Sequence, residues 1–105
     1  MYFPKDEHDL GLQIQASGKQ VLFFTANWCP DCHFILPVMP EIEAENPEFR
    51  FVQVERDDFM DVCQAYSVLG IPSFIVLENG QEVGRFVDRN RKTKAEITAF
   101  LKNFK

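Results

Sequence analysis

The feature that most constrains the fold is a short apolar run, residues 21–26, that leads directly into Trp28-Cys29-Pro30-Asp31-Cys32. The run is rich in β-branched and aromatic residues, which is typical of a strand buried on both faces. The next segment repeats apolar residues at the spacing of one helix face, at Ile35, Val38, Met39 and Ile42. The sequence therefore predicts a strand followed by a helix, with two cysteines at their junction.

The remaining segments continue an alternation of helices and strands. We expect helices at residues 6–17, 59–66 and 93–104, and further strands at residues 49–55, 73–77 and 81–87. Pro37 and Pro40 each lack a backbone N–H, so the helix after Cys32 should kink near Pro37 and restart at Pro40. This order predicts one α/β domain over residues 1–105, with a central mixed four-stranded sheet and helices on both faces.

Turn and capping residues support these boundaries. Asn79-Gly80 is a strong signal for a type I′ hairpin between the last two strands. Thr93 and Glu96 have the spacing of a capping box at the start of the final helix. Asp57 or Asp58 is expected to cap the helix that begins near residue 59.

Composition and charge exclude several classes of protein. With 46% hydrophobic and 26% charged residues, the 105-residue chain is an ordinary globular domain and is not disordered. A net charge of −5 disfavours nucleic acid and anionic membranes as partners, since both require a basic surface. No apolar stretch is long enough for a membrane span, and residues 1–10 contain no segment suited to a signal peptide. We therefore expect a cytoplasmic monomer.

In a reducing compartment, a Cys-x-x-Cys pair is more often catalytic or metal-binding than structural. Three interpretations of the pair are open from the residues alone. Cys29 and Cys32 could form a redox-active dithiol. With His33, they also match the pattern for c-type haem attachment. A zinc site would need a further ligand, for which only His8 and Cys63 are candidates.

The arrangement of these landmarks resembles the thioredoxin family. A strand runs into Trp28-Cys29-Pro30-Asp31-Cys32 and a kinked helix, and Gly70-Ile71-Pro72 and the Asn79-Gly80 hairpin follow at the family's spacing. The resemblance covers the chain from about residue 21 to its end. Over the first twenty residues the family's first strand should be shortened or absent.

The resemblance implies a thiol–disulfide oxidoreductase that reduces protein disulfides. Cys29, at a helix N-terminus that favours an anion, would attack the substrate, and Cys32 would resolve the mixed disulfide. Trp28 would belong to an exposed apolar platform, and Ile71-Pro72 would form a cis-proline loop that faces the dithiol and pairs with the substrate backbone. The family cycle uses no bound cofactor or metal and depends on an external donor such as a thioredoxin-reductase-like enzyme. A non-enzymatic adaptor with the same fold is the alternative.

Three positions depart from the family pattern. Pro30-Asp31 replaces the usual Gly-Pro, and the Asp31 charge should make the protein more reducing by up to roughly 30 mV unless solvent screens it. Phe23 occupies the place of a buried acid that normally assists proton transfer, so water, Asp31 or His33 would have to substitute. Asp88 stands where a glycine is usual and could narrow the range of partners.

Two further groups have simpler explanations. Cys63 shares an apolar helix face and is expected to be a buried, inert thiol. A basic cluster in the last third of the chain should form a solvated rim, and the sequence offers no support for its docking acidic partners; its members are Arg85, Arg89, Arg91, Lys92 and Lys94.

Overall fold

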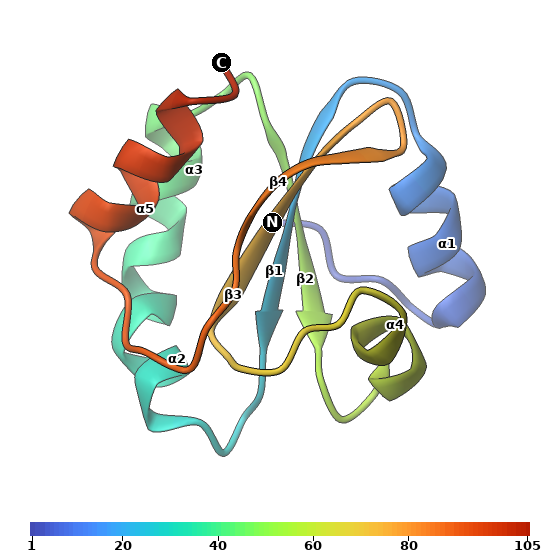
Figure 1. Cartoon of the computed structure of the whole chain (residues 1–105), viewed down its shortest axis with the longest axis horizontal. Coiled ribbons are helices and arrows are strands. Elements are labelled where there is room, and N and C mark those ends of the chain that lie inside the picture. Colours follow the sequence, from blue (N-terminus) through green and yellow to red (C-terminus); the bar gives the residue numbers. More distant parts are fainter.

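The computed structural model describes all residues, 1–105, and is built on a four-stranded sheet with helices on both faces (Figure 1). Its strands are β1 (Lys19–Thr25), β2 (Arg50–Glu55), β3 (Ser73–Glu78) and β4 (Gln81–Phe86), in the spatial order β2-β1-β3-β4. β1 is parallel to β2, whereas β3 is antiparallel to both β1 and β4. The mixed sheet predicted from the sequence is confirmed.

Helices pack on the two faces as separate groups (Figure 1). One face carries α2 (Pro30–Ile35), a 3₁₀ turn η1 (Leu36–Val38), α3 (Met39–Glu45) and α5 (Lys94–Lys102), and the other carries α1 (Glu7–Gln15) and α4 (Met60–Ala65). None of these helices has the length and apolar character needed to cross a membrane.

The central strand β1 contributes to two cores, because successive side chains of a strand point to opposite faces. Val21 and Phe23 pack into the core beneath α3 and α5, and Leu22 and Phe24 pack into the core beneath α1 and α4. All four side chains are fully buried. The two-sided burial predicted for this run is confirmed, and the strand is fixed in place up to the residue before the cysteine motif.

Most predicted boundaries agree with local geometry. The helix that follows the cysteines is interrupted by the η1 turn at Pro37, and α3 begins at Met39. Asn79 and Gly80 both have positive φ, of 52° and 84°, as the predicted hairpin requires. Thr93 and Glu96 form the predicted capping box of α5.

The predicted cap of α4 is wrong. Phe59 occupies the N-cap position, and no side chain caps the helix. Asp57 is instead turned toward the cysteine motif, where it accepts a hydrogen bond from the indole N–H of Trp28.

At the N-terminus of the chain, the family's first strand is reduced to one parallel bridge between Tyr2 and Val52, in agreement with the expected shortening.

Candidate active site

Cys29 occupies the junction between β1 and α2. It is the N-cap residue of α2, and Pro30 takes the first helical position, where its missing N–H costs no hydrogen bond. The backbone N–H of Cys32 donates to Cys29 Sγ at 3.2 Å. An N–H directed at a sulfur is a hydrogen-bond donor to that atom, so Cys29 Sγ has a backbone donor from the first turn of α2.

Cys32 has a different environment, although it lies only three residues further along. Its side chain is fully buried and packs against Ala26 and Cys29. Burial, followed by the hydrogen bond to Cys29, raises the pKa of the Cys32 thiol to about 11. Cys32 is therefore a protonated, protected thiol at neutral pH, and both cysteines are free thiols in this structure.

Thr25, the last residue of β1, lies beside Cys32 and had no role in the sequence prediction. Its hydroxyl acts against burial by lowering the pKa of Cys32, as does the Ala26 backbone. Thr25 is fully buried, and its Oγ1 has no partner at full hydrogen-bond geometry. The one signal in the sequence is that Thr25 is the only polar residue of an apolar run.

The predicted substrate-facing residues meet around Cys29. Trp28, Cys29 and Ile71 line the same groove, of about 250 Å³, and the Ile71–Pro72 peptide bond is cis. The Cys29 Sγ lies 3.8 Å from the carbonyl oxygen of Ile71. The indole of Trp28 is 58% exposed, and its Nε1 donates to Asp57 Oδ2 at 2.8 Å. The structure therefore brings the cysteine motif and the cis-proline loop together, as predicted.

Asp31 is paired with a residue from the distant end of the chain. Arg91 Nε donates to Asp31 Oδ1 at 2.9 Å, and the Arg91 guanidinium lies 4.4 Å from the centre of the Phe34 ring. Both charged side chains are partly exposed, so the attraction between them is screened by solvent. The charge predicted beside the cysteines is present, but it has a counter-ion that the sequence pattern did not indicate.

Lys92 is buried, so the prediction that the whole basic cluster forms a solvated rim is wrong for this residue. Its ammonium donates to Asp88 Oδ1 at 2.8 Å and to the backbone oxygens of Asn90 and Asp88, and it lies 5.0 Å from the centre of the Phe86 ring. These contacts replace the water that a lysine normally keeps. The hydrogen bond from Lys92 also lowers the pKa of the Asp88 carboxyl, so Asp88 is ionised at neutral pH and forms an ion pair with Lys92.

No acid lies beneath the dithiol on β1. Phe23 is fully buried and stacks on Phe74, with ring centroids 5.1 Å apart. His33, one of the proposed substitutes, is exposed and directs its Nε2 at the backbone carbonyl of Asn27. The groups that lower the pKa of the resolving thiol are instead the Thr25 hydroxyl and the Ala26 backbone.

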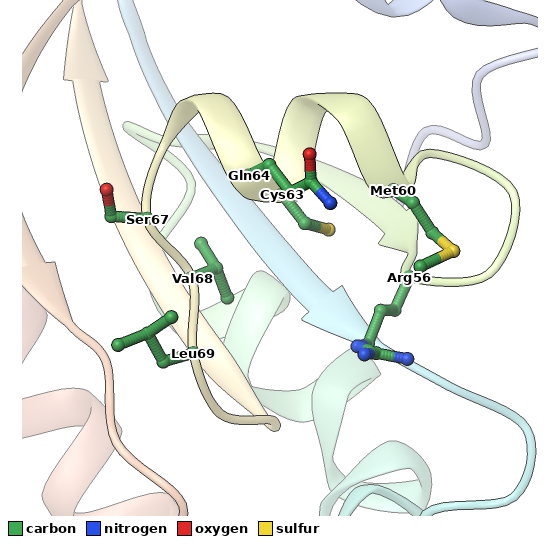
Figure 2. A pocket seen from close by; sticks show the side chains of 7 residues that line it. All are labelled: Arg56, Met60, Cys63, Gln64, Ser67, Val68 and Leu69. Carbon is green, nitrogen blue, oxygen red and sulfur yellow. The ribbon is translucent and has the colours of Figure 1, made fainter.

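Cys63 lies apart from the dithiol, on α4, and lines a separate cavity of about 310 Å³ with Arg56 and Leu69 (Figure 2). It is 5% exposed, as is Cys29, and burial raises the pKa of the Cys63 thiol, which disfavours its thiolate. No group of three or more His, Cys, Asp or Glu side chains could hold a metal ion, so the zinc alternative lacks a ligand set.

Comparison with known proteins decides the family. A family model described as Thioredoxin matches residues 3–103. The chain belongs to the thioredoxin family. It is 43% identical over 72 residues to a thioredoxin H-type from Fagopyrum esculentum, which covers 68% of this chain and 62% of that protein. It is 30% identical over 91 residues to mitochondrial thioredoxin-2 from Schizosaccharomyces pombe, covering 87% and 68%.

The thioredoxin fold is also found by structural comparison. The solved structure of Fasciola hepatica thioredoxin superposes with a TM-score of 0.85 over the whole of both chains, at 28% identity. The family resemblance and the fold predicted from the sequence are thus both confirmed. The chain spans about two thirds of the length of the two relatives named above.

Proposed function

We propose that this thioredoxin-family protein is a thiol–disulfide oxidoreductase that reduces protein disulfides through a reversible Cys29–Cys32 cycle. The observation that carries the proposal is the asymmetry between the two sulfurs. Cys29 faces a groove and accepts an N–H, whereas Cys32 is fully buried with a pKa raised to about 11. In such a pair, Cys29 attacks as a thiolate, and Cys32 stays protonated until it resolves the mixed disulfide.

The reaction transfers two electrons in two exchanges. The Cys29 thiolate attacks one sulfur of the substrate disulfide, which breaks the substrate S–S bond, forms a mixed disulfide and releases the first substrate thiolate. Cys32 then loses its proton and attacks Cys29 Sγ. This forms the Cys29–Cys32 disulfide and expels the second substrate thiolate. The protein dithiol is oxidised and the substrate is reduced to a dithiol. The proton that Cys32 loses and one proton taken from water protonate the two substrate thiolates.

The groove around Cys29 supports a protein as the substrate. Trp28 and Leu69 present large apolar surfaces, exposed by 58% and 79%, and exposed apolar side chains beside a reactive group are typical of a docking surface. The Ile71–Pro72 loop lies against Cys29, where it could pair with a substrate backbone. An external donor, such as a thioredoxin-reductase-like enzyme, would restore the dithiol. Cytoplasmic location and a monomeric state are also part of the proposal.

A single-turnover assay tests the activity. Reduced protein is mixed with an excess of a protein disulfide substrate, and its thiols are counted by alkylation and mass spectrometry. We expect the loss of two thiols per molecule, with the Cys63 thiol retained. Cys63→Ser should react like the wild type, whereas Cys29→Ser should reduce no substrate. The proposed function would be contradicted if the wild-type protein lost no thiols, or if the Cys29→Ser variant reduced the substrate as well as the wild type does.

A further inference from the structure

Arg89 borders the groove that contains Cys29, and it has no acidic partner. Its side chain lines this groove together with Trp28, Leu69 and Ile71. It is exposed and forms neither an ion pair nor a hydrogen bond within the chain. A guanidinium that borders a reactive groove without a carboxylate can bind one from outside.

The other charges around the groove are already paired. Arg56, which also lines the groove, contacts Asp57 at 3.4 Å. Arg91 is joined to Asp31. Asp88, the immediate neighbour of Arg89, is held by the buried ammonium of Lys92. Each of these three carboxylates therefore has a cationic partner other than Arg89.

Gly70 holds Arg89 close to the cis-proline loop. A Cβ atom at position 70 would lie 2.7 Å from Arg89 Cγ and 2.5 Å from the backbone oxygen of Asp88, so no other residue fits there without displacing the loop. The aliphatic part of Arg89 thus packs on the residue that precedes Ile71. This contact keeps Arg89 at the border of the groove that Cys29 also lines.

We propose that Arg89 selects protein disulfides that carry an aspartate or glutamate beside the reactive cysteine. The inference rests on the proposed function and specifies its substrate class. An acidic side chain next to the attacked sulfur would reach Arg89, while its apolar neighbours contact Trp28 and Leu69. The chain as a whole has a net charge of −5 and repels acidic partners at long range, so the selection is a local effect of this groove.

Two disulfide peptides test the proposal. They differ only in the residue next to each cysteine, which is glutamate in one peptide and glutamine in the other. The second-order rate constant for oxidation of the reduced protein is measured for both peptides at low ionic strength. We expect Arg89→Gln to slow reduction of the glutamate peptide by about two- to fivefold, the range of one exposed ion pair, and to leave the glutamine peptide unchanged. The difference should shrink as salt is added.

Lys102→Gln is the matched control, since it removes one positive charge from the end of α5, which lies near the C-terminus and away from the start of α2 (Figure 1). It should leave the ratio of the two rate constants unchanged, and Arg89→Lys should retain part of the preference. Equal slowing of both peptides by Arg89→Gln, or no slowing, would overturn the role of Arg89 while leaving the oxidoreductase intact. If the wild type reduces neither peptide, the proposed function itself fails.

Discussion

Arg91 Nε lies 2.9 Å from Asp31 Oδ1, which joins two residues 60 positions apart directly beside the dithiol. Asp31 alone would place a negative charge near the sulfurs and disfavour the thiolate. Arg91 offsets part of that charge, and its stacking on Phe34 holds the guanidinium in position. The unusual Pro30-Asp31 sequence is therefore compensated by a residue at the other end of the chain.

The pair leads to a prediction about the reduction potential. Arg91→Gln should lower the potential by about 10–30 mV, because the uncompensated Asp31 charge destabilises the reduced thiolate form relative to the disulfide. Asp31→Asn should raise the potential, and more so in the Arg91→Gln background than in the wild type. Equilibration with a thiol–disulfide buffer measures each value. An unchanged or higher potential for Arg91→Gln would show that the pair does not act on the sulfurs.

Thr25 should influence the second exchange of the cycle. In the folded protein the pKa of Cys32 is raised to about 11, so the resolving rate should increase with pH throughout the neutral and alkaline range. Removal of the hydroxyl in Thr25→Val should slow resolution by up to about tenfold and move this pH profile to higher pH, because a hydrogen bond to the forming thiolate is lost.

Quenched-flow measurement of mixed-disulfide decay tests this role, and Thr25→Ser is the control that keeps the hydroxyl. The serine variant should resolve at nearly the wild-type rate. If valine and serine slow the decay equally, Thr25 acts through packing alone. A valine variant with the wild-type pH profile would also contradict the hydrogen-bonding role.

The buried ammonium of Lys92 gives Asp88 a role in stability. Asp88→Asn should lower the free energy of unfolding at pH 7 by about 1–3 kcal/mol, because it leaves a buried charge without its counter-ion. The pKa of Asp88 is lowered in the folded protein, so its contribution is complete above the unfolded value of about 3.9 and is lost as pH falls through the lower folded value. Urea unfolding of both proteins between pH 7 and pH 3 should show their stabilities converging. A constant difference would exclude the ion pair as the cause.

Phe23 cannot be exchanged for the family's usual acid without loss of stability. Its ring is fully buried in a stack with Phe74, so Phe23→Asp should cost about 3–5 kcal/mol through lost packing and the burial of a carboxyl without a partner. Phe23→Leu keeps an apolar side chain and should cost roughly 1 kcal/mol. Denaturant unfolding compares the two variants. Equal stability would mean that the core around Phe23 accommodates a polar group.

The sequence allowed the sheet, the hairpin and the dithiol to be predicted because each depends on local signals. An apolar run specifies β1, Asn79-Gly80 specifies the hairpin, and the spacing of Cys29 and Cys32 places both sulfurs on one turn. The position of Ile71-Pro72 opposite the dithiol followed from the family pattern.

The predictions that failed concern side chains on loops, which contact residues from distant parts of the sequence. Asp57 turns toward Trp28 and does not cap α4, and Lys92 is buried because the turn after β4 folds over it. Arg91 lies in the same segment between β4 and α5, and there it contacts Asp31. Local sequence patterns contain no information on such pairings between charged side chains from distant segments, and exposed and buried lysines look alike in a sequence.

The central claim is that Cys29 attacks and Cys32 resolves, and trapping of the mixed disulfide measures it most directly. Reduced Cys32→Ser is mixed with a protein disulfide substrate, and intact-mass and peptide mass spectrometry identify any covalent adduct. We expect a stable adduct joined through Cys29 for Cys32→Ser, and none for Cys29→Ser. An adduct formed through Cys32 in the Cys29→Ser protein, or no adduct with either variant, would contradict the account.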